Sequence, residues 1–233
     1  MRNLLLLVFV LLTGCTSTLP NLLNGETTPM MPIRYLALGD SYTIGEGVEE
    51  KERFPEQLAT DISKEGFEVQ TEIIARTGWT TDELWQGIES RDLNPPYDLV
   101  TLLVGVNNQY RGRNVDEYRL EFEQLLEKAI FLAGSDPSRV IVLSIPDWGV
   151  TPFARAAGAS SALISTQIDE FNGVNKELAD EKGASYVDVT GISRQAAGDS
   201  SLLAEDGLHP SAIMYAKWIE LILPVAISRM DAP

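Results

Sequence analysis

Short apolar segments alternate with amphipathic segments along most of this chain, and this alternation is what most constrains its fold. The apolar segments have the length and composition of buried strands, and they are residues 33–38, 68–75, 97–105, 139–146 and 184–189. The amphipathic segments carry apolar residues at helical spacing, and they are residues 54–66, 80–90, 114–134, 161–183 and 210–230. This order predicts βαβ units. We therefore expect an α/β fold, a three-layer α/β/α sandwich with a mainly parallel five-stranded sheet.

Two prolines in the last amphipathic segment lead to specific expectations. Pro210 is expected in the first turn of the helix, where its missing N–H has no intrahelical partner to lose. Pro224 is expected to kink or divide the same helix, because its ring clashes with the preceding turn.

The first residues resemble a secretory leader. One arginine precedes a continuous apolar run from Leu4 to Leu12, which is too short to cross a bilayer. The run ends in "LLTGC", which resembles the cleavage box of bacterial lipoproteins, and Cys15 is the only cysteine of the chain. We expect a signal peptide (1–14), a flexible tether (15–32) rich in Thr, Pro and Asn, and one folded domain (33–233). Lipidated Cys15 would then anchor the protein to a membrane of the bacterial cell envelope; a plain signal peptide or an N-terminal anchor helix is the alternative.

Composition excludes several classes of function. The 233 residues carry a net charge of −16, which argues against binding to nucleic acid, since phosphate contacts need clustered Lys and Arg. A single His and a single Cys exclude the common zinc sites, so no metal site is expected. The chain has no glycine-rich phosphate loop of standard spacing, and no nucleotide or other cofactor is expected.

Polar and glycine residues follow the first three predicted strands. Ser41 follows the first strand, Gly78 the second and Asn107 the third, whereas Asp206 and His209 precede the last helix. The carboxyl ends of parallel strands meet at one edge of a sheet, so we expect these residues to converge there. The alternative is that Ser41 or Asp40 caps a helix, that Gly78 marks a turn, and that Asn107 and His209 are ordinary loop residues.

These residue types together support acyl transfer. A serine hydroxyl needs a base to take its proton, and His209 is the only imidazole that can do so. Asp206, three residues earlier, is near enough to orient that imidazole. The backbone N–H groups of Ser41 and Gly78 and the side-chain amide of Asn107 are suitable donors to an oxyanion.

The same residues carry a resemblance to the GDSL/SGNH hydrolase family, whose four blocks are named for Ser, Gly, Asn and His. "GDSY" (39–42) matches the first block, Gly78 the second, "GVNN" (105–108) the third and "DGLHP" (206–210) the fourth. The blocks occur in the family's order over residues 34–211. The resemblance implies a flavodoxin-like fold and a metal-free carboxylic ester hydrolase with Ser41, His209 and Asp206 as its triad.

The chain departs from the family pattern at two positions. Tyr42 replaces the usual leucine after the serine, which bears on the lining of the pocket. Asn108 stands where an aspartate commonly follows the catalytic asparagine, which puts the positioning of Asn107 in doubt.

Aromatic residues and an arginine in the loops are candidates for substrate contacts. They are Trp79, Tyr110, Arg111 and Trp148, with Phe153 nearby. Packing beneath the loops is the alternative role for each of them. No long apolar lid is evident, which favours small or water-soluble esters, with deacetylation of a glycan and cleavage of a lysophospholipid both open. A lipoprotein that binds a ligand without turnover, and an acyltransferase with the same triad, are the competing functions.

Overall fold

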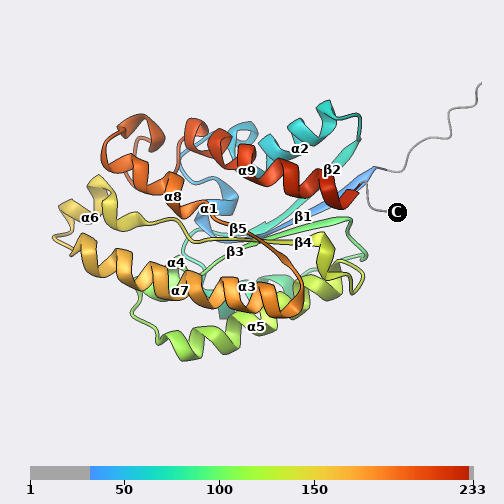
Figure 1. Cartoon of the computed structure of the whole chain (residues 1–233), viewed down its shortest axis with the longest axis horizontal. Coiled ribbons are helices and arrows are strands. Elements are labelled where there is room, and N and C mark those ends of the chain that lie inside the picture. The colour runs from blue at the N-terminus through green and yellow to red at the C-terminus, as the bar shows by residue number, and fades with distance from the viewer. Residues whose placement is uncertain (1–31, 231–233) are drawn as a thin grey trace, which may run out of the picture. The chain divides into compact units, whose positions relative to one another are not determined.

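Five parallel strands form the sheet at the centre of the computed structural model, which describes residues 32–230 (Figure 1). They are β1 (Ile33–Gly39), β2 (Val69–Ala75), β3 (Leu99–Leu103), β4 (Val140–Leu143) and β5 (Ser185–Val187). Their order in the sheet is β2-β1-β3-β4-β5, and every pair is parallel. The predicted fold class is therefore confirmed. The predicted signal peptide lies outside the described residues, as does the predicted tether apart from its last residue.

Helices cover both faces of the sheet, as Figure 1 shows. Helices α2 (Phe54–Lys64) and α9 (Ala212–Met230) pack together on one face. Helices α3 (Thr81–Glu89), α5 (Val115–Leu132) and α7 (Ser161–Lys182) cover the other face. Because both faces are covered, every residue of β3 and β4 is buried, which explains why these strands are apolar at consecutive positions.

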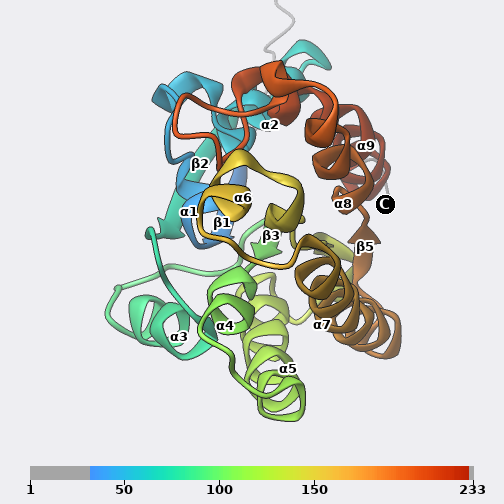
Figure 2. The ribbon, with the colours of Figure 1, turned by 90° about the vertical axis from the view of Figure 1, so that its left-hand side faces the viewer.

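The strands end in register at one edge of the sheet. Gly39, the last residue of β1, pairs with Ala75 of β2 and with Leu103 of β3. Four short helices follow strand ends near this edge, and they are α1 (Ser41–Ile44), α4 (Val106–Tyr110), α6 (Pro152–Ala156) and α8 (Thr190–Ser193). Figure 2 shows α1, α4 and α6 gathered around the ends of β1 and β3. The loops after β1, β2 and β3 therefore meet in space although they are far apart in sequence.

The structure corrects the prediction for Pro210. Helix α9 begins at Ala212, and Pro210 instead pairs with Leu203 in an isolated antiparallel bridge. Hydrogen bonds from Ala204 N to His209 O (2.8 Å) and from Ser211 N to Leu202 O (2.8 Å) hold this segment extended. Because Ser211 N donates to Leu202 O, the helix begins only after Ser211.

Pro224 does not divide α9. The helix is continuous from Ala212 to Met230 and contains Pro224 in its interior. Trp218, Ile222 and Ala226, on either side of the proline, are all buried against the core. Burial of this apolar stripe offsets the single backbone hydrogen bond that proline removes. No helix among residues 32–230 is long and apolar enough to cross a membrane.

Candidate functional site

Ser41 is the first residue of α1, and only Asp40 separates it from the end of β1. Asp40 caps the short helix by accepting a hydrogen bond from Tyr42 N at 3.0 Å on its Oδ1. A Cβ atom on Gly39 would lie 2.1 Å from Thr43 Oγ1 and 2.4 Å from the carbonyl oxygen of Leu103, so only glycine permits this tight turn. The Ser41 side chain is 4% exposed, and its hydroxyl has no hydrogen-bond partner among the described residues. The turn thus presents an unengaged hydroxyl at the edge of the sheet.

His209 and Asp206 form a closely bonded pair before α9. His209 Nδ1 lies 2.6 Å from Asp206 Oδ2. The other carboxylate oxygen, Oδ1, accepts hydrogen bonds from Leu208 N at 2.9 Å and from His209 N at 3.0 Å. The Asp206 carboxylate therefore accepts hydrogen bonds from both the backbone and the ring within the same turn, which explains how Asp206 and the His209 ring meet.

The charge of Asp206 determines the tautomer of His209. Burial raises the pKa of the Asp206 carboxyl, but the hydrogen bonds from the His209 ring and from two backbone N–H groups outweigh burial and hold this pKa below its ordinary value. An ionised carboxylate only accepts, so Nδ1 of His209 must carry the proton that it donates. Nε2 of the neutral ring is then left as an acceptor, which is what a general base requires.

Tyr42 supports the imidazole from the side. Its ring meets that of His209 edge-on, with centroids 5.6 Å apart and an interplanar angle of 63°. The carbonyl oxygen of Tyr42 accepts a hydrogen bond from the buried Tyr215 hydroxyl at 2.9 Å, which ties α1 to α9. Tyr42 thus packs against the His209 imidazole.

Asn107 of α4 is hydrogen-bonded to the loop between β2 and α3, which contains Gly78. Asn107 Nδ2 donates to the carbonyl oxygen of Trp79 at 2.9 Å, which leaves its second N–H free of that bond. Gly78 has φ +86°, a left-handed conformation that glycine adopts without strain. Arg111 Nη2 donates to the carbonyl oxygen of Gly78 at 2.6 Å and so fixes the peptide plane that follows Gly78.

Asn108 connects α4, which carries Asn107, to the start of α3. It is fully buried, and its Oδ1 accepts from Thr81 N at 3.1 Å while its Nδ2 donates to Thr81 Oγ1 at 2.6 Å. Nδ2 also lies 3.4 Å from Glu121 Oε2. An aspartate here would set a carboxylate against that of Glu121, whereas the amide satisfies both neighbours. Asn108 therefore anchors the start of α3 to α4 and supports the position of Asn107.

A cavity of about 190 Å³ brings these groups together at the edge of the sheet. Ser41, Gly78, Asn107 and His209 all line it. Its apolar wall is formed by Tyr42, Val106, Tyr110, Trp148, Phe153 and Leu208. Of the residues predicted to contact substrate, Tyr110 and Trp148 line the cavity, as does Phe153.

Trp79 and Arg111 do not line the cavity. The Trp79 ring packs on α3, where a Cβ atom added to Gly87 would lie 2.3 Å from it. The Arg111 guanidinium is bound to Gly78 and lies 3.3 Å from the Glu83 carboxylate. Both side chains therefore hold the Gly78 loop in place. Trp79 packs beneath the loop, whereas Arg111 bonds to it from the exposed side.

One contact between loops at the site was not predicted from the sequence. Thr77, which also lines the cavity, donates a hydrogen bond from its hydroxyl to the Glu46 carboxylate. This contact joins the loop after β2 to the turn after α1. No sequence signal points to it, because the two residues are 31 positions apart. Among residues 32–230, no group of three or more His, Cys, Asp or Glu side chains is placed to hold a metal ion.

The Asp40 carboxyl makes the free energy of unfolding depend on pH. Its carboxyl is fully buried, and its Oδ2 has no hydrogen-bond partner among the described residues. Burial raises the pKa of Asp40 from 3.8 to about 7, against the opposing effect of the hydrogen bond from Tyr42 N. The folded protein therefore holds this proton over a range of pH in which the unfolded chain has released it.

We expect Asp40→Asn to flatten the pH dependence of stability between about pH 4 and 7. A raised folded-state pKa stabilises the fold at low pH, and this contribution falls by about 1.4 kcal/mol per pH unit as pH rises through that window. Asparagine keeps the Oδ1 acceptor but does not titrate. Urea unfolding at several pH values should show the variant gaining stability relative to the parent as pH rises. Asp92→Asn, at an exposed aspartate, is the control. If the unfolding free energies of Asp40→Asn and the parent changed with pH in parallel, the raised pKa of Asp40 would be contradicted.

The fold and the cavity together define a class of protein. A serine at the carboxyl edge of a parallel sheet lines the same cavity as an imidazole paired with a carboxylate, and residues of these types can catalyse acyl transfer. The sequence comparison is more specific, because residues 37–217 match the model of the GDSL-like Lipase/Acylhydrolase family. The chain belongs to this family, and it is by class a carboxylic ester hydrolase.

Solved structures share the fold. The lipase/acylhydrolase from Enterococcus faecalis superposes with a TM-score of 0.67 at 24% identity, over 85% of this chain and 97% of that one. The psychrotrophic esterase EstA from Pseudoalteromonas sp. gives 0.61 at 16% identity, over 86% and 100% of the two chains. An acetylxylan esterase from Geobacillus stearothermophilus gives 0.61 at 16% identity, over 87% and 98%. At these identities the likeness concerns the fold alone. No curated protein matches the sequence.

Proposed function

We propose that this protein is a serine esterase that hydrolyses small or water-soluble carboxylic esters through an acyl-enzyme. One observation carries the proposal: Ser41 and His209 line the same cavity, and His209 Nδ1 is bonded to Asp206 at 2.6 Å. A ligand-binding protein without turnover has no need of an imidazole oriented in this way. An acyltransferase shares the triad and differs only in the acceptor that attacks the acyl-enzyme.

The proposed reaction proceeds in two halves. Ser41 Oγ attacks the ester carbonyl while its proton passes to Nε2 of His209, and the negative charge develops on the carbonyl oxygen. The backbone N–H groups of Ser41 and Gly78 and the Asn107 amide stabilise that oxyanion. The C–O bond then breaks, and the alcohol leaves with the proton from Nε2. Water, deprotonated by Nε2, attacks the acyl carbon. The bond from Oγ to that carbon then breaks, Nε2 returns the proton to Ser41 Oγ, and the acid leaves.

A serine-reactive phosphonate tests the proposal directly. An activated serine displaces the leaving group and becomes covalently bonded to phosphorus, so the protein gains the mass of the phosphonyl group. An unactivated serine does not react. We expect labelling at Ser41 and none in His209→Ala. An ester panel that includes acetylated xylan and a lysophospholipid then separates the substrate classes, and product analysis with a sugar acceptor separates hydrolysis from transfer. An unlabelled Ser41 in a protein that still binds esters would favour the binding function.

We expect Asn107→Ala to lower kcat by about 10²–10³-fold, because it removes one donor to the oxyanion. The loss should fall mainly on kcat, since the charge on the oxygen develops only in the transition state. Hydrolysis of p-nitrophenyl acetate measures it. Asn94→Ala changes an exposed asparagine in a loop before β3 and serves as the matched control. An effect of less than threefold on kcat would remove Asn107 from the proposed oxyanion site.

We also propose that the protein is a lipoprotein of the bacterial cell envelope, anchored to a membrane through Cys15. The support is the "LLTGC" sequence after an apolar leader and the position of the single cysteine. Several acyl chains on one cysteine bind a membrane firmly, whereas a single chain does not. Cys15→Ala should therefore move the protein from the membrane fraction to the soluble fraction. Equal partition of the parent and the variant would contradict the proposal.

A further inference from the structure

Besides His209, four aromatic residues line the cavity: Tyr42, which packs on His209, and Tyr110, Trp148 and Phe153. Of the last three, Trp148 is the most buried. It is 6% exposed, whereas Tyr110 is 58% and Phe153 is 38% exposed. Its indole meets both other rings edge-on, with centroids 5.3 Å from Tyr110 and 6.2 Å from Phe153. Tyr110 and Phe153 thus form the outer part of the wall, and Trp148 forms its inner part.

The orientation of the Trp148 ring is set by a hydrogen bond. Nε1 of the indole donates to Gln109 Oε1 at 2.7 Å, and Gln109 Nε2 donates to Gln167 Oε1 of α7 at 2.8 Å. Both glutamine contacts lie behind the cavity wall. The indole therefore cannot turn away without leaving a buried amide oxygen unpaired, which is costly.

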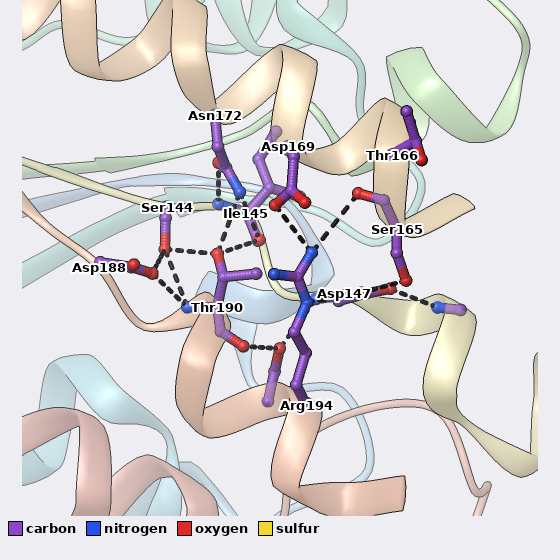
Figure 3. A network of polar contacts seen from close by, with 12 residues as sticks. Ser144, Ile145, Asp147, Ser165, Thr166, Asp169, Asn172, Asp188, Thr190 and Arg194 are labelled. Carbon is purple, nitrogen blue, oxygen red and sulfur yellow. Dashed lines mark hydrogen bonds and ion pairs between the residues drawn. The ribbon is translucent and has the colours of Figure 1, made fainter. Parts of the chain in front are cut away.

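The backbone that carries Trp148 is held by a buried carboxylate. Asp147, fully buried, accepts hydrogen bonds from Gly149 N at 2.9 Å and Ser165 Oγ at 2.6 Å, and its Oδ2 lies 2.9 Å from Arg194 Nε (Figure 3). Its own N–H donates to Ser193 Oγ at 2.9 Å. A buried charge is retained only when it is paired in this way. The turn after β4 is thus fastened to α7 and to the segment after α8.

Arg194 completes the anchor from outside. Its Nη2 donates to Asp169 Oδ1 of α7 at 2.7 Å, so one guanidinium joins two carboxylates (Figure 3). A planar guanidinium with several donors suits this bridging position, and a lysine would supply only a point charge. Neither Asp147 nor Arg194 lines the cavity, and the pair reaches it through the turn that carries Trp148.

We propose that Trp148 is the wall that limits the length of the acyl group, and that Asp147 and Arg194 are positioning residues for it. The proposal rests on the esterase function above. In this arrangement the alcohol, which must leave and be replaced by water, lies toward the exposed Tyr110 and Phe153, and the acyl group lies against the buried Trp148. At about 190 Å³ the cavity is smaller than the roughly 300–1,000 Å³ that encloses a drug-sized ligand. Acetyl and other short acyl esters are therefore the expected substrates.

Three p-nitrophenyl esters, the acetate, butyrate and hexanoate, provide the test. One methylene that a pocket cannot accept costs roughly 10–200-fold in kcat/KM. We expect the parent protein to prefer acetate to hexanoate by at least about tenfold on that scale. Trp148→Ala should raise the ratio of hexanoate to acetate kcat/KM by about 10–100-fold, and Trp148→Phe by less, because phenylalanine retains most of the wall.

Arg194→Gln tests the anchor separately. It should raise the same ratio severalfold without loss of the phosphonate reaction at Ser41, a readout that general destabilisation would not shift toward longer chains. It also serves if Trp148→Ala fails to fold. Trp85→Ala, an aromatic residue on α3 outside the cavity, is the matched control and should leave the ratio unchanged.

The two proposals fail in different ways. If the parent hydrolyses none of the esters and Ser41 does not react with the phosphonate, the esterase function is wrong and this inference fails with it. If the parent is active but hydrolyses all three esters alike, or if neither Trp148 variant nor Arg194→Gln changes the ratio, only the inference is overturned.

Discussion

Ser41→Ala should lower kcat for p-nitrophenyl acetate by about 10⁶-fold, the scale found when a serine nucleophile is removed from a triad. The substitution should leave the fold intact. Asp40 caps α1 through Tyr42 N, and the Ser41 hydroxyl bonds to no other described residue, so no hydrogen bond in the described part of the chain is lost. The unfolding midpoint should therefore stay near that of the parent.

His209→Ala should cause a loss of the same size, and the double variant should be no worse than either single variant. The reason is that nucleophile and base act as one unit, so removing either removes the whole function. Ser200→Ala changes an exposed serine at the start of the 3₁₀ helix Ser200–Leu202 and is the matched control. If Ser41→Ala kept more than a tenth of the parent activity, the covalent mechanism would be wrong.

Asp206→Asn should lower kcat by about 10⁴-fold, as expected when the orienting carboxylate of a triad becomes an amide. The geometry explains why. Oδ1 accepts two backbone N–H groups, so the amide oxygen must take that place and the NH₂ group must face Nδ1 of His209. Nδ1 then becomes the acceptor and Nε2 carries the proton, so the ring cannot take a proton from Ser41.

The Asp206→Asn variant distinguishes a wrong tautomer of His209 from a loss of folding. The turn should persist because both backbone hydrogen bonds are retained, and the unfolding free energy should change little. Glu205→Gln, an exposed carboxylate one residue earlier, controls for the loss of a negative charge at the same turn and should be fully active. A mildly active Asp206→Asn, within tenfold of the parent, would show that His209 does not depend on Asp206 for its tautomer.

Local patterns were sufficient for the layers of the fold and for the order of the motifs. The apolar run 33–38 and the helical spacing of apolar residues in 80–90 and 114–134 predicted where strands and helices lie, because backbone hydrogen bonding and side-chain periodicity are local properties. The ends of elements were less well predicted. The segment 97–105 forms a strand only over Leu99–Leu103, because its outer residues contribute to the loops around it.

The direction of individual side chains depends on contacts that are distant in sequence. Trp79 and Trp148 both stand in loops after strands, yet Trp79 packs on Gly87 and Trp148 lines the cavity. Asp147 is held by Arg194, 47 positions away, and no pattern within either segment announces that pair. The misplacement of Pro210 has the same origin, since the bridge to Leu203 is a tertiary contact.

The sequence by itself determined that this chain forms a parallel sheet between helices and that a serine, a glycine, an asparagine and a histidine follow or precede its elements in the order of one hydrolase family. Periodicity and turn chemistry suffice for that, because they act over a few residues. Only the tertiary structure decided that the Asp206 carboxylate faces Nδ1 of His209 and that Trp148 closes the inner wall of the cavity. Those positions result from packing between elements, where a side chain's neighbours are chosen by the whole fold.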